Sequence, residues 1–363
     1  MTLNRSLIAP TANPLLERAL QEKLARRAET TGSLGELEPV AIRLGMMQNS
    51  LKPRFHDPQL LLFAADHGLA VDGVGDRHGR TTAELVRQAL TGQLPVSVFA
   101  RNQGLELTVV DAGVADKLPP HSRLMARKIA HGTRNVRVGA AMAIEQAHAA
   151  IRAGMEIADS LPGDVRACAG LGIGSAESAA LVMSRLGDAP VRDLLLAGPQ
   201  MKQDDLAKLL VIAQGAQGRH RDVSDPVEVL AAFGGFEIAM MVGLMLVAAS
   251  KRHLIMVDGM AACAALLVAS RIAAPVTDYC VFCRSNGHHG LDTAIGLFQA
   301  SALLELGMES TDGTGTTLAW PLIKSAAALL TEVAEGEDPG PTRPADLAAL
   351  GDDTRRSGPG TLT

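Results

Sequence analysis

The sequence contains few aromatic residues and no excess of basic ones. Phe, Trp and Tyr together make up 2% of the 363 residues, with one Trp and one Tyr. Proteins that stack the bases of single-stranded nucleic acids need more rings than this. The formal net charge is −5 and the pI is about 6.1, so no basic surface is expected to attract a phosphate backbone. We therefore expect an aliphatic core and no nucleic-acid partner.

Cysteines and long hydrophobic runs are also scarce. Four cysteines in a chain of this length do not make a disulfide framework. Cys280 and Cys283 match a redox motif only by spacing, and inside an apolar strand we interpret them as core residues. The most apolar segment, residues 238–250, is too short to cross a bilayer. The N-terminus MTLNRSLIAPTANP lacks the apolar centre of a secretion signal, so we expect a cytoplasmic protein without membrane contact.

Aliphatic residues are abundant and regularly placed. Hydrophobic residues make up 47% of the chain, and short apolar runs alternate with segments of helical spacing. The expected strands are 60–65, 105–111, 166–169, 254–258 and 274–283, and the expected helices are 15–29, 82–100, 141–160, 235–250, 259–271, 293–306 and 317–333. This alternation predicts an α/β fold with a doubly wound, mostly parallel sheet covered on both faces.

In such a sheet, ligands bind outside the carboxyl ends of the strands. The loops at that edge are residues 66–80, 111–114, 170–175, 258–259, 284–292 and 311–315. We therefore place the candidate ligand site among them.

Residues 170–175 read GLGIGS and lead into an expected helix. Glycines allow the backbone to approach a ligand, and the N–H groups at a helix N-terminus favour an anion. The spacing matches neither the dinucleotide fingerprint nor a P-loop. On the residues alone, the segment is either a phosphate site or a tight turn with Ser175 as the helix N-cap.

Three other loops carry polar residues with more than one possible role. Asp66 and His67 follow the first strand, where they could bind a ligand or stabilise a turn. Glu237, just after Gly235, gains from the dipole of its helix and could also bind ribose hydroxyls. Residues 286–290, NGHHG, hold adjacent histidines that point apart and have no third ligand at useful spacing, so no metal site is expected.

The stretch STDGTGTT, residues 310–317, sets a single carboxylate among glycines and hydroxyl side chains. Asp312 precedes the last expected helix. A carboxylate there can cap the helix, bind a metal or take a proton from a substrate. The stretch alone does not decide between these roles.

Seven segments occur in an order and spacing that point to one enzyme family. They are FAADHGLAVDGVG (63–75), VVDAGV (109–114), GTRN (132–135), GLGIGSAESAA (170–180), GGFEIAMMVG (234–243), VDGMAACAALL (257–267) and DGTGTTLAWPLI (312–323). Together they resemble the nicotinate-nucleotide:dimethylbenzimidazole phosphoribosyltransferase family, from about residue 15 to residue 333.

The resemblance implies a doubly wound sheet with a smaller helical domain built from both chain ends, and a homodimer whose sites are completed by the partner. It implies transfer of the phosphoribosyl group of nicotinate mononucleotide to a benzimidazole nitrogen, with inversion at C1′, in synthesis of the cobamide lower ligand. No cofactor or metal is implied. The expected division is residues 1–50 as the N-terminal part of the small domain, 51–310 as the α/β core, 311–335 as the active-site loop and C-terminal helix, and 336–363 as a polar tail.

The resemblance also assigns roles to single residues. Asp312 stands where the family has a Glu as its general base. Residues that bind the phosphate or nucleotide are expected at Gly172, Ile173, Gly174, Ser175, Gly235, Glu237, Asp258, Gly259, Gly313, Thr314 and Gly315. Residues that bind the acceptor are expected at Asp66, His67, Gly75 and Leu171.

Several ligand-facing positions depart from the family's pattern. The side chain of Asp312 is one methylene, about 1.5 Å, shorter than Glu. Gly170 stands where the family has a carboxylate, and residues 196–201 and 284–290 also differ. The alternative hypothesis is a diverged relative that binds a nucleotide or azole without turnover, or that uses a different acceptor. A dinucleotide oxidoreductase is disfavoured because no G-x-G-x-x-G follows an early strand.

Overall fold

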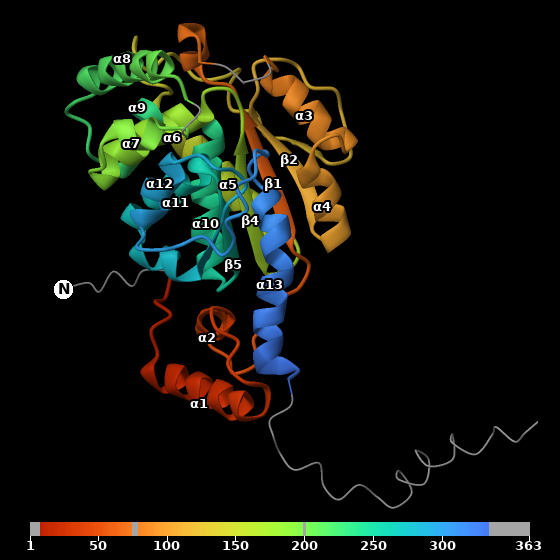
Figure 1. Ribbon diagram of the computed structural model, residues 1–363. Helices are drawn as coiled ribbons and strands as arrows, with labels where there is room; N and C mark the ends of the chain where they lie inside the picture. Colours follow the sequence, from red (N-terminus) through yellow and green to blue (C-terminus); the bar gives the residue numbers. More distant parts are fainter. Residues whose placement is uncertain (1–7, 75–78, 199–200, 334–363) are drawn as a thin grey trace, which may run out of the picture.

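A six-stranded parallel sheet forms the centre of the computed structural model, which describes residues 8–74, 79–198 and 201–333 (Figure 1). The strand order is β3-β2-β1-β4-β5-β6. The strands are β1 (Gln59–Ala65), β2 (Glu106–Gly113), β3 (Leu124–Ala126), β4 (Val165–Leu171), β5 (Leu254–Asp258) and β6 (Cys280–Cys283). The chain winds outward in opposite directions from β1 and β4, so the sheet is doubly wound and the predicted fold class is confirmed.

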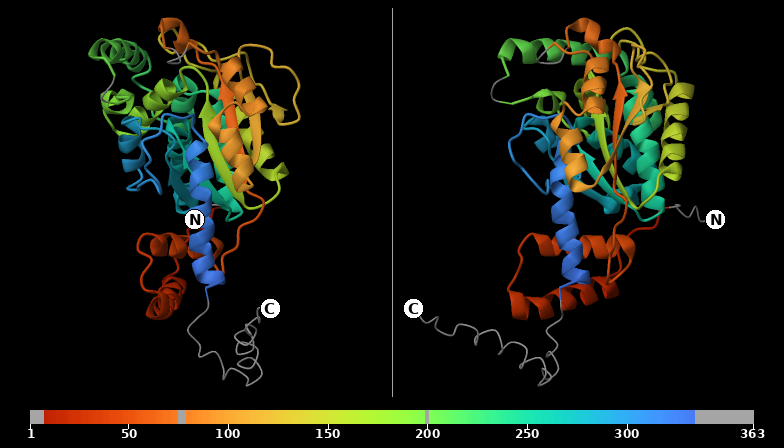
Figure 2. Two further views of the ribbon diagram at one scale, coloured as in Figure 1. Left: turned by 45° about the vertical axis from the view of Figure 1, so that its right-hand side comes forward. Right: turned by 90° about the vertical axis from the view of Figure 1, so that its right-hand side faces the viewer.

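Helices cover both faces of this sheet and form a smaller part below it. They are α1 (Pro14–Thr31), α2 (Leu37–Gln48), α3 (Thr82–Thr91), α4 (Pro95–Gln103), α5 (Ile144–Ser160), α6 (Ser175–Gly187), α7 (Val191–Leu195), α8 (Gln203–Arg219), α9 (Pro226–Phe233), α10 (Phe236–Ser250), α11 (Met260–Ile272), α12 (Gly290–Gly296) and α13 (Thr314–Thr331), with 3₁₀ helices η1 (Gly68–Asp72) and η2 (Ala274–Tyr279). In Figure 2, right, α3, α4 and α13 lie on one face, and α5 and α10 lie on the other.

The central strands are buried along their whole length, which explains their near-continuous apolar sequences. Every residue of β1, β4 and β5 is buried. Gln59, Arg166 and Asp258 are the polar exceptions. The guanidinium of Arg166 donates to the carbonyl oxygens of Leu161, Pro162, Gly163 and Val165. These bonds pair both terminal nitrogens of a buried cation and close the turn that precedes β4, while Nε of Arg166 has no hydrogen-bond partner among the described residues.

A smaller helical part drawn from both chain ends lies below the sheet in Figure 1. It contains α1, α2 and the C-terminal half of α13, which packs against α2. The start of α13 lies at the sheet, so this helix joins the two parts. The exact domain boundaries stay a prediction, and the expected tail, 336–363, lies outside the described residues.

Three predicted elements differ from the structure in where they begin or end, or in being divided. The strand expected at 274–283 is a 3₁₀ helix followed by the short β6, because Pro275 lies in the first turn of η2 and cannot donate to a strand ladder. The helix expected at 293–306 is α12, which ends at Gly296 before Gln299 adopts a φ of 52°. The segment 82–100 is mostly helical, as predicted, but it is divided into two helices, because Gly92 has a φ of 77° and Pro95 begins α4.

The described helices include none that is long and apolar enough to cross a membrane. The buried helix α10, which contains the most apolar segment of the sequence, packs against α5, α11 and the sheet instead.

Candidate functional site

The carboxyl ends of β1, β4, β5 and β6 bring most of the predicted residues to one edge of the sheet. Asp66 and His67 follow β1, and Leu171 to Ser175 join β4 to α6. Gly235 and Glu237 begin α10, Asp258 and Gly259 join β5 to α11, and residues 312–315 begin α13. Gly75 lies outside the described residues.

A buried cluster connects three of these segments. The carboxylate oxygen Oε1 of Glu237 lies 2.8 Å from Nε2 of His67 and accepts a hydrogen bond from Oγ of Ser175 at 2.8 Å. The second oxygen, Oε2 of Glu237, is buried and has no hydrogen-bond partner among the described residues. The cluster thus ties β1, α6 and α10 together and leaves one carboxylate oxygen unsatisfied.

The protonation of His67 is set by this cluster. Burial is the largest single effect and lowers the pKa of His67, but the acidic side chains around it, Glu237 first, together raise the pKa above its ordinary value. Asp66 and Glu177 contribute to this rise in the pKa. A Cβ at Gly174, which has a φ of 85°, would lie 2.9 Å from Cβ of His67, and a Cβ at Gly235 would overlap Oε2 of Glu237 and Cε1 of His67. Glycine is required at these two positions because His67 and Glu237 fill the space.

Ser175 is not the N-cap that one hypothesis assigned to it. Helix α6 begins at Ser175, and its N-cap is Gly174. Because the Ser175 hydroxyl donates to Glu237, it does not cap the helix. Glu177 lies in the first turn, and burial raises the pKa of its carboxyl, which disfavours negative charge beside the turn.

Asp66 organises the loops around β1 and β2. Its Oδ1 accepts from Oγ1 of Thr82 at 2.5 Å, and its Oδ2 accepts from the N–H of Ala115 at 2.7 Å. Oγ1 of Thr82 also accepts from the N–H of Ile173 at 3.1 Å. Asp66 therefore has a structural role in positioning the glycine-rich loop, and that loop's Ile173 N–H is already bonded.

A second cluster lies where β5, β6 and α13 meet. Asp258 is fully buried, and its carboxylate accepts hydrogen bonds from the N–H and hydroxyl of Ser285 and from the N–H groups of Gly313 and Thr316. Two of these donors belong to the first turn of α13 or its N-cap, where negative charge is favoured. Burial raises the pKa of Asp258, and the hydrogen bonds offset part of the rise.

Asp312 lies beside this buried carboxylate. Its Oδ1 accepts from Nδ2 of Asn286 at 2.7 Å. Burial raises the pKa of Asp312 well above its ordinary value, and the Asp258 carboxylate raises it further, while the Asn286 hydrogen bond lowers it. Gly259 has a φ of 91°, and a Cβ there would overlap the Asp312 carboxylate. The site thus holds a carboxylate that binds a proton more readily than an ordinary Asp.

The neighbouring predicted residues support the start of α13. Oγ1 of Thr314 donates to the carbonyl of Thr311 at 2.7 Å, and the N–H of Gly315 donates to Oγ of Ser285 at 2.5 Å. A Cβ at Gly315 would lie 2.7 Å from the carbonyl carbon of Arg284, so glycine permits the close approach of the loop after β6. Thr314 and Gly315 therefore stabilise the first turn of α13 through contacts inside the protein.

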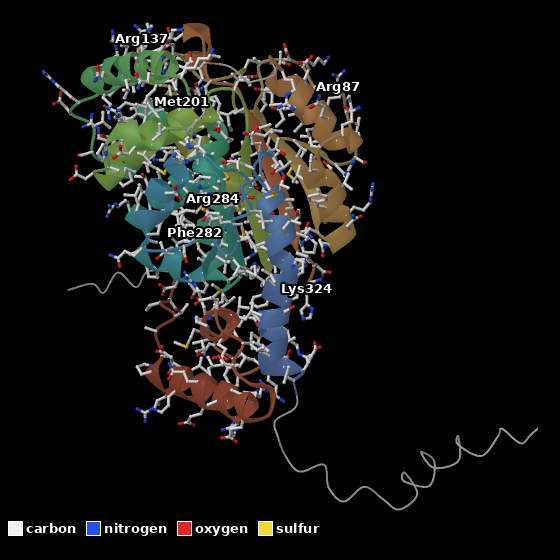
Figure 3. The ribbon with its side chains drawn as sticks, in the orientation of Figure 1. Arg87, Arg137, Met201, Phe282, Arg284 and Lys324 are labelled. Atoms are coloured by element: carbon white, nitrogen blue, oxygen red, sulfur yellow. The ribbon has the colours of Figure 1, made fainter. Side chains whose placement is uncertain are left out.

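Sequence reasoning missed four residues of these clusters. Thr82, Ser285 and Asn286 complete the hydrogen bonds of Asp66, Asp258 and Asp312. The buried Arg284 (Figure 3) donates to the carbonyl oxygens of Asn286 and His288 and pairs with Asp292 and Glu305. The only available signal was position, because Arg284 and Ser285 directly follow a strand whose carboxyl end lies at the ligand edge.

The remaining predictions concern metals and thiols. The described residues contain no group of three or more His, Cys, Asp or Glu side chains that could hold a metal ion. Cys280 and Cys283 are free and buried, and burial raises the pKa of the Cys280 thiol to about 12. A thiol with so high a pKa is not an activated nucleophile.

Comparison with known proteins connects this geometry to one family. A family model described as phosphoribosyltransferase matches residues 9–340. The chain is 40% identical to the nicotinate-nucleotide–dimethylbenzimidazole phosphoribosyltransferase of Cupriavidus taiwanensis, over 90% of this chain and 95% of the relative. It is also 40% identical to the enzyme of the same name from Cupriavidus necator, over 90% and 96%.

Solved structures agree with the sequence relatives. The crystal structure of the enzyme of this name from Thermus thermophilus superimposes with a TM-score of 0.79 at 28% identity, covering 88% of this chain and 96% of that one. A structure described as CobT from the same organism gives a TM-score of 0.81 at 28% identity, over 87% and 96%. The chain therefore belongs to the nicotinate-nucleotide–dimethylbenzimidazole phosphoribosyltransferase family.

Proposed function

We propose that the protein transfers the phosphoribosyl group of nicotinate mononucleotide to a nitrogen of a benzimidazole-like acceptor, with inversion at C1′ and with Asp312 as the general base. The observation that carries the proposal is the place of Asp312 in a chain of this family: its carboxylate lies against Gly259, beside Asp258, at the carboxyl ends of the strands. Burial and the Asp258 carboxylate raise its pKa. A base works best when its pKa lies near the operating pH, so an Asp with a raised pKa suits this task.

In the proposed transfer, one bond forms at C1′, one bond breaks there, and one proton is removed from the acceptor. The acceptor nitrogen forms a bond to C1′ from the face opposite the nicotinate. The C1′–N bond of the donor breaks, and its electron pair leaves with the pyridine ring, which was a cation in the donor. The proton on the acceptor's ring nitrogen passes to Asp312. In this scheme the enzyme supplies alignment and proton removal, and no metal or cofactor takes part.

The donor's phosphate is proposed to bind at Gly172–Ser175. This segment leads into α6, whose N-terminus favours an anion. The raised pKa of His67 gives it cationic character behind the same turn. The ribose is proposed to lie near Glu237, whose Oε2 has no partner among the described residues. A ribose hydroxyl that reached this oxygen would satisfy a buried acceptor.

The proposal has a direct test. The purified protein is incubated with nicotinate mononucleotide and 5,6-dimethylbenzimidazole, and released nicotinate is measured by chromatography. Release that depends on the acceptor is expected. Asp312→Asn should lower kcat about 10²- to 10⁴-fold, because general-base catalysis contributes about that much. Asp159→Asn, whose exposed side chain pairs with Lys251 away from the site, is the matched control and should keep full activity.

Other results would change the proposal in defined ways. Release with another azole or a phenol, but not with dimethylbenzimidazole, would keep the donor and replace the acceptor. If no nicotinate is released with benzimidazoles, purines and phenols, the transferase proposal fails. Calorimetric binding of nicotinate mononucleotide without release would then support the non-catalytic alternative.

We further propose that the protein is a homodimer, as the resemblance to its family implies. Sedimentation equilibrium across a range of protein concentrations tests this, with twice the chain mass of 37.9 kDa expected. A mass of one chain at all concentrations would contradict it.

A further inference from the structure

We propose that Asn286 is a positioning residue for the general base: its side-chain amide binds Oδ1 of Asp312 and leaves Oδ2 to accept the proton from the acceptor substrate. This inference rests on the proposed function, because it assigns Asn286 its role through Asp312. The distance from Nδ2 to Oδ1 is 2.7 Å, which is short for a nitrogen donor and typical of a charge-assisted bond.

The orientation of the Asn286 amide follows from its other contact. The backbone N–H of His288 donates to Oδ1 of Asn286 at 3.1 Å. Because that N–H can only donate, it must face the amide oxygen, and the amide nitrogen must then face Asp312. Asn286 therefore offers a hydrogen to the carboxylate and cannot present its oxygen there without losing the bond to His288.

The backbone that carries Asn286 is held on both sides. Asn286 forms an antiparallel bridge with Glu309, and the N–H of Gly287 donates to the carbonyl of Met308 at 3.0 Å. Nε of Arg284 donates to the carbonyl of Asn286 itself at 3.0 Å. A donor anchored in this way fixes the direction in which the Asp312 carboxylate points.

The two oxygens of Asp312 have different surroundings. Oδ1 accepts the Asn286 hydrogen bond, which is the one hydrogen bond to this carboxylate among the described residues. Oδ2 lies beside Gly259, where a Cβ would overlap it. With Oδ1 occupied, Oδ2 is the oxygen left to take a proton.

The groups around Asp312 disfavour its ionised form, so the hydrogen bond from the Asn286 amide matters for its pKa. Asp258 faces it from the end of β5, and the thiol of Cys263 faces the same pair of carboxylates from α11. The charge of Arg284 is directed to Asp292 and Glu305 and away from Asp312. Among these groups, Asn286 is the one that stabilises the ionised form of Asp312, against burial and the repulsion from Asp258.

The test compares Asn286→Ala and Asn286→Asp with the wild-type protein in the nicotinate-release assay from pH 5 to pH 9. Losing the donor should raise the pKa of Asp312, so the acid limb of the kcat/KM profile should move to higher pH. We expect kcat to fall about 10- to 100-fold, the range caused by a base displaced by up to 1 Å, with KM for nicotinate mononucleotide changed less. Asn286→Asp keeps the side-chain shape but adds a charge, and should move the limb further.

A matched control and a direct titration complete the test. Asn102→Ala alters an exposed asparagine of α4 and should leave the profile unchanged. The Asp312 carboxyl is also titrated by ¹³C NMR in protein labelled at aspartate, with its resonance assigned by comparison with Asp312→Asn. A higher pKa in Asn286→Ala than in the wild-type protein supports the inference without relying on catalysis.

The outcomes separate the two proposals. If the wild-type protein transfers phosphoribose while Asn286→Ala and Asn286→Asp keep its pH profile, its kcat and its Asp312 titration, the positioning role of Asn286 is wrong and the proposed function stands. If the wild-type protein shows no transfer with any acceptor, the proposed function fails. An unchanged Asp312 titration in both folded variants would overturn the Asn286 contact in that case as well.

Discussion

At the scale of single residues, Asp312 is the product of opposing effects. Burial and the nearby Asp258 carboxylate favour its protonated form, and the amide of Asn286 favours the ionised form. The first two effects prevail, so this short acid holds its proton to a higher pH than an ordinary Asp. For the proposed role of Asp312 as general base, a raised pKa would offset some of the disadvantage of a side chain one methylene shorter than Glu, because base strength rises with pKa.

A raised pKa also has a cost for stability. The folded protein keeps the Asp312 proton at a pH where the unfolded chain, with its ordinary value near 3.8, has lost it. Stability therefore falls as the pH rises from about that value through the folded-state pKa, and it stays lower above it.

We expect Asp312→Asn to unfold at a higher temperature than the wild-type protein at pH 8, because it removes a buried charge beside Asp258 without changing the side-chain shape. The advantage should shrink as the pH is lowered toward 4. Thermal unfolding followed by circular dichroism at pH 4, 6 and 8 measures the difference. An advantage that is the same at every pH would show that the ionisation of Asp312 has no part in it.

At the scale of elements, the site depends on how closely two helices approach. Helices α5 and α10 cross at two glycines: a Cβ at Gly154 would overlap the carbonyl of Met240, and a Cβ at Gly243 would overlap the carbonyl of Ile151. Because both obstacles are backbone atoms of a helix, a rotamer change cannot relieve them. This crossing fixes α10, whose first turn carries Glu237.

Gly243→Ala should therefore destabilise the protein by about 1–3 kcal/mol, the usual cost of overpacking a core. The matched control is Gly218→Ala in α8, where a Cβ would meet no atom within 4 Å. That change should stabilise the protein by up to about 1 kcal/mol through helix propensity. Urea unfolding of both variants measures the effects. Equal stabilities for the two variants would contradict the close crossing of α5 and α10.

At the scale of the whole molecule, the helical part is joined to the sheet by α13 and by a shared apolar core, and a few polar contacts add to them. Arg252, just before β5, donates from Nε to the carbonyl of Met47 at 2.7 Å and from a terminal nitrogen to the carbonyl of Met46 at 2.9 Å. Its guanidinium also lies over the ring of Tyr279 at 5.6 Å. These contacts hold the end of α2 against the amino-terminal edge of the sheet, opposite the ligand edge.

Arg252→Ala should lower the free energy of unfolding by about 2 kcal/mol, because two hydrogen bonds from a charged group are lost. Hydrogen exchange should become faster in α1 and α2 and change little in β1 and β4. The control is Arg101→Ala on the exposed surface of α4, which should change stability by less than about 0.5 kcal/mol. Uniformly faster exchange over the whole chain would argue against a local fastening of α2.

The sequence by itself determined the sheet, and with it the edge at which we predict a ligand to bind. The apolar runs of β1, β4 and β5 are buried on both faces, and a run of that kind between helical segments has few other solutions. The prediction was wrong where one residue overrode the apolar pattern: with Pro275 in its first turn, Ala274–Tyr279 of the expected strand 274–283 forms the 3₁₀ helix η2. The glycines at 174 and 259 were predicted to lie near a ligand, but their contacts with His67 and Asp312 were not.

Only the tertiary structure decided which polar groups meet. Glu237 bonds to His67, 170 positions away, and Asn286 bonds to Asp312, which lies beside Asp258. Local sequence patterns report periodicity and turns, which depend on neighbours along the chain. The pKa of a carboxylate depends on burial and on charges within a few ångströms in space, and those neighbours are set by the winding of the sheet. The sequence therefore indicated where Asp312 lies along the chain, and the fold determined the pKa of its carboxyl.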